Sequence, residues 1–212
     1  MMNKKTLAVG ATALAVVFAA TACSDSDSDT GTTVATSTAP ASAGTPAEQA
    51  TAHNDADVMF AQMMLPHHSQ AIEMSDMLLA KDNIPAEVTA LAEQIKTAQG
   101  PEIDQLESWL DQWGEPTKMP ESDHDMPGMD GGMAEMEGMM SEEDMQALAD
   151  AQGTDAARLF LEQMIAHHEG AVDMAQTEIE DGQFPDAVAM ARTIVDTQQQ
   201  EIDTMRQLLT TL

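Results

Sequence analysis

The chain has 212 residues and is strongly acidic, with 37 Asp and Glu against 8 Lys and Arg and a formal net charge of −29 at pH 7. This charge would repel nucleic acid and anionic lipid head groups, so we exclude nucleic acid as a partner. The single cysteine, Cys23, excludes an intramolecular disulfide, whereas methionine is abundant, with 19 residues.

Residues 1–22 are predicted to be a secretory signal peptide rather than a membrane span. Lys4 and Lys5 precede an uncharged stretch that ends in Ala20-Thr-Ala-Cys23. A cysteine directly after small residues resembles the lipid-attachment cysteine of bacterial lipoproteins, although Ala20 stands where leucine is usual. We therefore predict an extracytoplasmic protein, anchored to the cell membrane by a lipid on Cys23. The alternative is ordinary secretion with a free thiol.

Residues 23–53 are predicted to form a disordered tether that follows the signal peptide. They are mostly Ser, Asp, Thr, Ala, Gly and Pro, with too little apolar surface to offset the chain entropy lost on folding. Residues 54–212 instead carry four long segments with apolar residues at helical spacing, and no alternating runs typical of strands. We therefore predict a single all-α domain over residues 54–212.

The expected helices begin at recognisable caps. Asn54 is a typical N-cap, and Ser141-Glu-Glu-Asp144 is typical of a capping box that opens a short helix. Proline and glycine residues mark the expected breaks between helices. We expect helices over residues 54–80, 85–113, 141–151, 153–180 and 185–212. Pro66 and Pro101 lie inside the first two, where they predict kinks.

The chain contains an internal repeat. The segment FAQMMLPHHSQAIEM, which begins at Phe60, returns as FLEQMIAHHEGAVDM from Phe160, and the helices that follow match as well. One helical hairpin cannot bury its own apolar face, but two hairpins can cover each other. We therefore predict a four-helix bundle made of repeat 1 (54–113) and repeat 2 (141–212), joined by a Met-rich linker (114–140).

A histidine layer is predicted inside this bundle. Helical spacing places one histidine of each repeat, together with methionines, on an inward-facing seam of its helix. The seam residues are Met64, His67, Met74, Met164, His167 and Met174. The neighbouring histidines, His68 and His168, lie about 100° further round the helix. One histidine of each pair should therefore face inward and the other a neighbouring helix or groove.

Polar residues interrupt the facing seams of the second and fourth long helices at matching positions: Gln99, Glu102, Gln198 and Glu201. A buried carboxylate is costly unless it is paired, so we expect these glutamates to hold imidazole rings, as outer-shell carboxylates do at metal sites. A buried polar network with methionine as core filler is the alternative, and Glu102 could also lie at the rim. The doubled Met-x-x-His-His pattern favours metal binding.

The linker between the repeats is unusually rich in methionine. His124, Met126 and Met129 stand there among Gly, Pro, Asp and Glu residues, with further methionines on either side. Thioethers suit Cu(I) and Ag(I) and offer little to Zn(II), Mg(II) or Ca(II). The alternative is an oxidisable Met-rich surface for a protein partner, or a sink for oxidants. We predict that these three residues bind copper.

The paired Phe-x-x-x-Met-x-x-His-His-x-x-Ala-x-x-Met segments, each followed by Gln-x-x-Glu-Ile, resemble the bacterial domain-of-unknown-function 305 family. The segment from Met139 to Met145 adds to the resemblance, which covers residues 54–212. It implies a ferritin-like four-helix fold and binding of Cu(I) and Ag(I) through Met and His, as in CopM-like members linked to metal resistance. The implied ligands are Met64, His67, His68, Met74, Met164, His167, His168 and Met174.

We therefore predict a binding protein and not an enzyme. It would hold reduced copper outside the cytoplasmic membrane and buffer it, or pass it to a copper exporter or oxidase. One alternative is a ferritin-like di-iron oxidase, which needs inward Glu-x-x-His pairs, but the chain has that spacing only at Glu121 and His124 in the linker. The other alternative, a partner-binding lipoprotein without metal, leaves the doubled His-His unexplained.

Overall fold

The computed structural model of the protein describes residues 52–118 and 138–212. These residues form five α-helices and no β-strand, which confirms the all-α prediction. The predicted signal peptide, the predicted lipidation site Cys23 and the predicted linker ligands His124, Met126 and Met129 lie outside the described residues.

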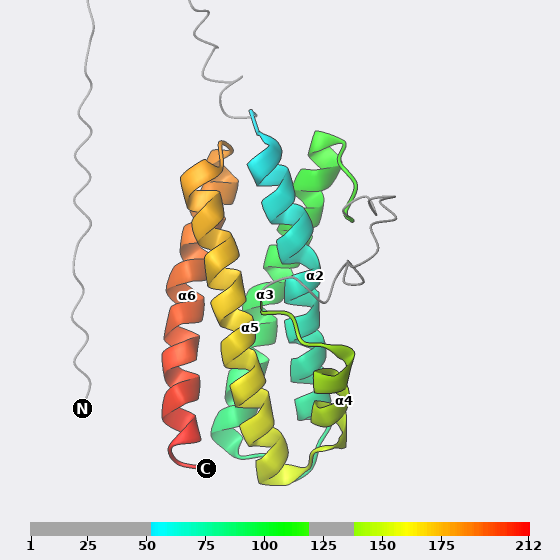
Figure 1. Ribbon diagram of the computed structural model, residues 1–212, viewed down its shortest axis with the longest axis vertical. Helices are drawn as coiled ribbons and strands as arrows, with labels where there is room; N and C mark the ends of the chain where they lie inside the picture. Colours follow the sequence, from blue (N-terminus) through cyan, green and yellow to red (C-terminus); the bar gives the residue numbers. More distant parts are fainter. Residues whose placement is uncertain (1–51, 119–137) are drawn as a thin grey trace, which may run out of the picture. The chain divides into compact units, whose positions relative to one another are not determined.

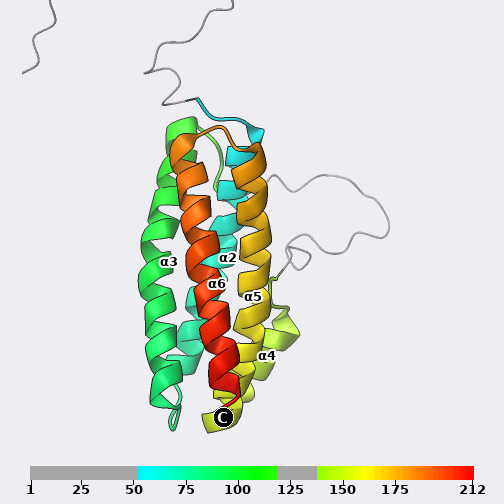
Figure 2. The ribbon, with the colours of Figure 1, turned by 90° about the vertical axis from the view of Figure 1, so that its left-hand side faces the viewer.

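Four long helices and one short helix make up the described part of the chain. They are α2 (Asp55–Leu79), α3 (Ala86–Trp113), α4 (Glu142–Asp150), α5 (Gly153–Asp181) and α6 (Pro185–Leu209). Helices α2 and α3 form one hairpin, α5 and α6 form the other, and α2 packs against α5 in the antiparallel sense (Figures 1 and 2). The short helix α4 packs on α2 and α5.

The helix ends follow from local side-chain chemistry. The Asn54 side chain accepts hydrogen bonds from the backbone N–H groups of Ala56 and Asp57, and the Asp57 carboxylate accepts one from the Asn54 backbone. Ser141 and Asp144 form the same reciprocal capping box at the start of α4. Such a box satisfies backbone donors that the first turn of a helix leaves without partners.

Both internal prolines are accommodated within continuous helices. Pro66 lies inside α2 and Pro101 inside α3, and each helix is assigned without a break across its proline. At the other end of α3, Gly114 adopts a φ of 74°, a left-handed conformation that glycine reaches at little cost. The helix therefore ends at Gly114 and not at its internal proline.

The buried apolar residues form two clusters along the bundle of α2, α3, α5 and α6. One cluster contains Leu78 of α2 and Phe160 of α5, with residues from the adjoining ends of α3 and α6. The other contains Phe60 of α2 and Ala175 of α5, again with residues from both other helices. On α2 and on α5, the His-His pair falls between the residues of the two clusters. The histidines therefore form a polar layer between two apolar cores.

A buried pair of acidic side chains joins the two hairpins at one end of the bundle. Asp57 of α2 and Glu178 of α5 are both almost fully buried. Asp57 accepts hydrogen bonds from the backbone N–H groups of Gln183 and Phe184. Burial, together with the hydrogen bond and charge of Asp57, raises the pKa of Glu178 to about 8. The carboxyl group of Glu178 is therefore largely protonated at neutral pH.

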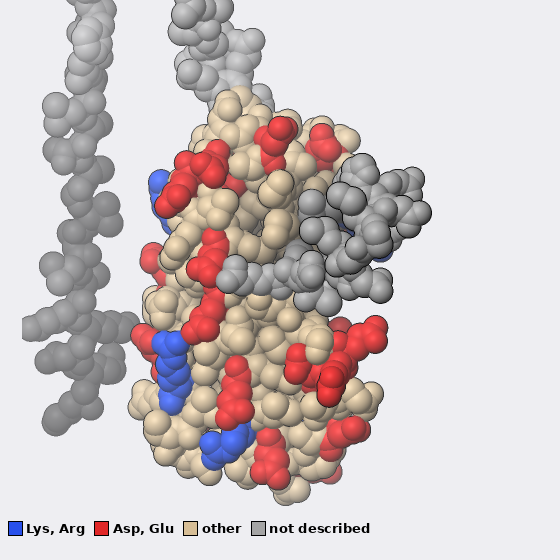
Figure 3. Space-filling view, in the orientation of Figure 1, with Lys and Arg blue, Asp and Glu red and all other residues tan. Residues whose placement is uncertain are grey.

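The surface of the described helices is acidic. Figure 3 shows Asp and Glu side chains spread from one end of the visible face to the other, with few Lys and Arg side chains among them. Among the described residues, none of the helices is long and apolar enough to cross a membrane.

Candidate metal centre

Four buried histidines occupy the middle of the bundle. His67 and His68 lie on α2, His167 and His168 lie on α5, and all four side chains have 0% exposed surface. Histidine is rarely buried in such numbers without a partner for its ring nitrogens, because an unpaired polar atom in an apolar interior costs about 1 to 3 kcal/mol. The groups that contact the four imidazole rings therefore indicate which role this layer can have.

His67 and His167 face each other across the α2–α5 contact. Their ring centroids lie 3.7 Å apart, with the ring planes inclined by 38°. Burial holds the pKa of His167 well below its usual value, and the neighbouring histidines, His67 first among them, lower it further. Charge on one ring disfavours charge on the other, so His167 is suited to the neutral state.

Each of the other two histidines is held by a glutamate. His68 Nε2 lies 2.8 Å from Glu102 Oε2 of α3, and His168 Nε2 lies 2.8 Å from Glu201 Oε2 of α6. The glutamates thus pair with the histidines off the inward seam, while the seam histidines meet each other. The bundle reproduces the same histidine–glutamate bond in both repeats.

The two glutamates differ in their surroundings. The Glu201 side chain is 7% exposed and the Glu102 side chain 18%. Glu201 Oε1 also accepts a hydrogen bond of 3.0 Å from Gln94 Nε2 of α3, which crosses from one hairpin to the other. The residue of α6 that corresponds to Gln94 in the repeat is Thr193, whose hydroxyl bonds its own helix at Ala189. Glu201 is therefore held more firmly than Glu102.

The hydrogen bond to glutamate fixes which nitrogen of His168 is free to bind another group. Burial lowers the pKa of His168, which favours the neutral ring although Glu201 opposes the shift. A carboxylate can only accept, so Nε2 carries the proton and Nδ1 carries the lone pair. His168 Nδ1 is buried and has no hydrogen-bond partner among the described residues, and the same is true of His68 Nδ1. The layer therefore contains two buried imidazole nitrogens, His68 Nδ1 and His168 Nδ1, that no described residue engages in a hydrogen bond.

Other polar atoms of the layer also lack partners within the described part of the chain. Both amide atoms of Gln99 and the Oε1 atom of Gln198 are buried without a hydrogen bond. At the same time, the described residues contain no group of three or more His, Cys, Asp or Glu side chains arranged to hold a metal ion. The potential ligands in this layer are therefore imidazole nitrogens, without a surrounding group of carboxylate ligands among the described residues.

The structure separates the predicted methionine ligands into two groups. Met64 and Met164 are fully buried and precede the seam histidines by one helical turn. Met74 and Met174 follow the seam histidines by two turns, which is about 10.5 Å along the helix axis. Met74 packs inside one apolar cluster and Met174 against the other. The first group therefore lies closer to the seam histidines along the helix axis than the second group does.

The end of the predicted linker lies directly against this layer. A Cβ atom at Gly138 would come within 3.0 Å of the backbone oxygens of Ala166 and His167, so only glycine fits this approach to α5. Two residues later, the Gln70 side chain donates to the Met140 carbonyl at 2.9 Å and accepts from its N–H at 2.8 Å. Residues 138–140 therefore contact α5 next to the histidine layer and α2 one turn away from it.

Sequence reasoning missed Gln94 and Gln70. Both lie away from the inward seams, and neither has a glutamine at the matching position of repeat 2, where the chain has Thr193 and Gly170. The available signal was this departure from the repeat: a polar residue present in one copy only is a candidate for a contact that breaks the pseudosymmetry.

Comparison with known proteins places these features in a family. The model of the family "Domain of unknown function (DUF305)" matches residues 57–209. The search among curated proteins finds no match. The crystal structure of a DUF305 fragment from Deinococcus radiodurans is 34% identical, with a TM-score of 0.65, and the match covers 75% of this chain and 98% of that one.

Two further solved structures give the same result. A putative secreted DUF305 protein from Streptomyces coelicolor is 34% identical, with a TM-score of 0.65, over 74% of this chain and 93% of that one. CopM in its Cu(I)-bound form is 30% identical, with a TM-score of 0.59, over 73% of this chain and 96% of that one. CopM is also described in Cu(II)-bound and Ag-bound forms. The protein belongs to the DUF305 family.

Proposed function

We propose that the protein is an extracytoplasmic, membrane-tethered metal-binding lipoprotein that binds Cu(I) or Ag(I) through histidine and methionine, and that it buffers these ions or hands them on. Its role is binding and not turnover. Within it, α2, α3, α5 and α6 form a ferritin-like four-helix bundle made of two repeats, and His68 and His168, with Met64 and Met164, form the centre of the site.

The observation that carries this proposal is the pair of buried Nδ1 atoms of His68 and His168. Each belongs to a ring whose Nε2 atom is bonded to a glutamate at 2.8 Å. A carboxylate on the far nitrogen orients an imidazole and raises its basicity, which is the usual arrangement around metal-binding histidines. Buried lone pairs with no hydrogen-bond partner among the described residues are ready acceptors for a cation.

The charge and softness of the surroundings favour a monovalent soft cation. Glu102 and Glu201 place acidic side chains beside the two rings, so a bound cation would offset their negative charge in a poorly solvated layer. The thioethers of Met64 and Met164 suit Cu(I) and Ag(I). CopM, at about 30% identity, is described with Cu(I), Cu(II) and Ag bound, which supports this choice of metal.

The proposed location and partners rest on the sequence. The signal peptide and the lipid-attachment pattern at Cys23 support export and tethering, and the similar Streptomyces protein is described as secreted. His124, Met126 and Met129 would add soft ligands in the linker, which ends against the histidine layer at Gly138. A copper exporter or oxidase is the proposed recipient of the metal.

The decisive experiment is an anaerobic titration of the chain with Cu(I) in competition with a chromophoric Cu(I) chelator. It compares the wild-type chain with the His68→Gln, His168→Gln double variant, in which glutamine keeps a polar side chain but supplies no imidazole nitrogen. We expect the double variant to bind Cu(I) at the layer at least about 10-fold more weakly, the lower end of the effect of disturbing a metal site's outer shell.

The matched control is His53→Gln. His53 stacks on Trp113 with ring centroids 4.6 Å apart and lies outside the layer, so this variant should bind like the wild type. Unchanged Cu(I) affinity in the double variant would place the tight Cu(I) site outside the histidine layer. A wild-type chain without tight Cu(I) binding would exclude the copper function.

A further inference from the structure

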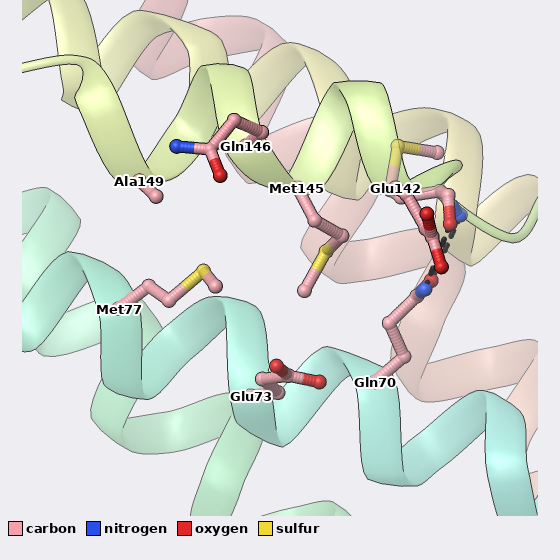
Figure 4. Close-up of a pocket in the computed structure, with 8 residues that line it drawn as sticks. Gln70, Glu73, Met77, Glu142, Met145, Gln146 and Ala149 are labelled. Carbon is pink, nitrogen blue, oxygen red and sulfur yellow. Dashed lines mark hydrogen bonds between the residues drawn. The ribbon is translucent and has the colours of Figure 1, made fainter.

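A surface groove with three methionines lies between α2 and α4, away from the histidine layer. It has a volume of about 350 Å³. Figure 4 shows Met77 of α2 and Met145 of α4 extending into the space between the two helices, with Glu73 beside them. The lining residues are Gln70, Glu73, Met77, Met140, Glu142, Met145, Gln146 and Ala149.

The three methionines come from three separate segments of the chain. Met77 lies on α2, Met140 precedes α4 and Met145 lies on its first turns. All three are half-buried, and each packs on the neighbouring apolar cluster while it also lines the groove. Thioether groups from distant positions thus line one solvent-accessible groove. Such a set is a soft, neutral ligand group of the kind that Cu(I) and Ag(I) prefer.

Hydrogen bonds fix the wall of the groove that α4 provides. The Gln70 side chain bonds both the N–H and the carbonyl of Met140. Lys81 Nζ of the α2–α3 turn donates to the Ala149 carbonyl at 2.7 Å, and Gln163 of α5 donates to the Asp144 carbonyl at 2.9 Å. The short helix is therefore held at both ends, which fixes the backbone that carries Met140 and Met145.

The charge of the groove suits a cation. Glu73 and Glu142 are exposed acidic residues on opposite walls, and no Lys or Arg lines the groove. Their charge would draw a cation toward the thioethers and offset its charge once bound.

Repeat 2 lacks the side chains that line the α2 wall of this groove. The positions of α5 that match Gln70, Glu73 and Met77 hold Gly170, Asp173 and Thr177. The matching position thus has a hydroxyl side chain, exposed and bonded to its own helix at Asp173, where α2 has a thioether. Met77 is therefore not a residue that the helical repeat requires for packing.

We propose that this groove is a second soft-metal site, which binds one Cu(I) or Ag(I) ion through the thioethers of Met77, Met140 and Met145. The inference rests on the proposed function because both require soft-metal binding. It is nevertheless independent of the histidine layer in its ligands and in its access to solvent.

The test is a silver titration of the chain labelled with ¹³C at its methionine methyl groups, with Ag(I) added as the nitrate in chloride-free buffer. It compares the wild-type chain with the Met77→Leu, Met140→Leu, Met145→Leu variant and with His68→Gln, His168→Gln. Leucine keeps the volume and the apolar character of methionine but has no sulfur, so the fold should survive. Thermal unfolding of each variant checks this.

We expect the methyl signals of the three groove methionines to shift with Ag(I), in the wild type and in the histidine variant alike. The leucine variant should bind one Ag(I) ion fewer, whereas the Met190→Leu control, away from the groove, should bind as the wild type does. If the three signals stay in place while the wild type still binds Ag(I), the groove proposal is wrong and the proposed function stands. A wild type that binds no Ag(I) overturns the proposed function itself.

Should the leucine variant unfold, Met77→Leu alone decides the question. This single change removes one thioether at a half-buried position, and Ag(I) should then bind the groove more weakly while the Met140 and Met145 signals still shift. Unchanged Ag(I) affinity together with unshifted Met140 and Met145 signals would overturn the groove site.

Discussion

The imidazole rings of His67 and His167 lie 3.7 Å apart between their centroids, at the centre of the α2–α5 contact and without exposed surface. The two rings come from matching positions of the repeat, so the pseudosymmetry places a histidine of one repeat against the equivalent histidine of the other. Two adjacent buried imidazoles can remain neutral together but cannot both be charged at low cost. Protonation of these rings should therefore affect the stability of the histidine layer.

The metal-free protein should lose stability in mild acid. The pKa values of His167 and His168 are lowered in the folded state, so below about pH 6.5 the unfolded chain binds more protons at these rings than the folded chain does. Their contribution is therefore present above that pH and is lost as the pH falls, at up to about 1.4 kcal/mol per pH unit for each proton. Urea unfolding at several pH values measures it.

The comparison has to be made against a His167→Gln, His168→Gln variant. Glu178, whose pKa is raised to about 8, gives a slope of the opposite sign in the same range, and the variant keeps Glu178. The difference in unfolding free energy between the wild type and the variant isolates the histidines. A difference that does not change between about pH 7.5 and pH 5.5 would contradict the buried, neutral histidine layer.

Removing the carboxylate that holds an imidazole should weaken metal binding. We expect Glu201→Gln to lower Ag(I) affinity at the layer by about 10-fold or more, since an amide orients the ring less strongly than a carboxylate does. Glu102→Gln should have a smaller effect, because the Glu102 side chain is more exposed and lacks the additional bond from Gln94. Competition titrations measure both affinities, with the exposed Glu93→Gln as the control. The reverse order of effects would argue against this account.

Two methionine pairs should behave differently although both recur in the repeat. We expect the Met64→Leu, Met164→Leu variant to bind Ag(I) more weakly at the histidine layer. Replacing the pair two turns away, Met74 and Met174, should leave this affinity unchanged, because about 10.5 Å separates them from the seam histidines along the axis. Leucine substitutions at such sites usually cost less than about 1.5 kcal/mol, so folding is retained. If both variants lose the same Ag(I) affinity, the proposed difference between the two methionine pairs is wrong.

The helices and their caps could be predicted from the sequence because they depend on local chemistry. Asn54 and Ser141 begin helices through bonds to residues two or three positions away, and Gly114 ends one through its own backbone freedom. The polar interruptions at Glu102 and Glu201 could be predicted from helical spacing. The bounds of all five helices accordingly fall close to those expected.

Contacts between segments that are distant in the sequence could not be predicted from local patterns. Helical spacing placed His67 and Glu102 on facing seams, but helix rotation decides that Glu102 meets His68 and that His67 meets His167. The bond from Gln94 to Glu201 joins residues 107 positions apart and has no counterpart in the repeat. The groove at Met77 required the docking of α4, which no pattern within α2 indicates.

The buried pair of Asp57 and Glu178 should make the protein less stable in alkaline solution. Because the pKa of Glu178 rises from 4.5 to about 8 on folding, the stability linked to its proton is complete below about pH 4.5 and is lost as the pH rises through 8. Glu178→Gln mimics the protonated carboxyl and should raise the melting temperature near pH 8.5, by about 2 to 4 °C for each kcal/mol gained.

Calorimetric scans at about pH 6 and pH 8.5 test this prediction, with the exposed Glu180→Gln on the same helix as the control. The matching residues at the other end of the bundle, Leu78 and Ala157, are apolar and fully buried. The pair thus replaces an apolar contact at one end only. If Glu178→Gln and the wild type melt alike at both pH values, Glu178 is ionised and the proposed protonation is wrong.

The last prediction concerns the attachment of Met140 to α2. The Gln70 side chain makes two hydrogen bonds to the backbone of Met140, and a hydrogen bond contributes about 0.5 to 1.5 kcal/mol to stability. Gln70→Ala removes both bonds and should release residues 138–145 from α2, with little effect on the core, because Gln70 belongs to neither apolar cluster. Hydrogen exchange measured by mass spectrometry should show faster exchange confined to this segment.

The exposed Gln176→Ala on α5 serves as the control and should exchange as the wild type does. Released Met140 also leaves the groove, so Gln70→Ala should weaken Ag(I) binding at the groove. Binding at the histidine layer should stay unchanged, because His68 and His168 are held by Glu102 of α3 and Glu201 of α6. Unchanged exchange at 138–145 would show that Gly138 and α4 hold this segment without Gln70. Equal weakening at both sites would show that the two sites are coupled and not independent.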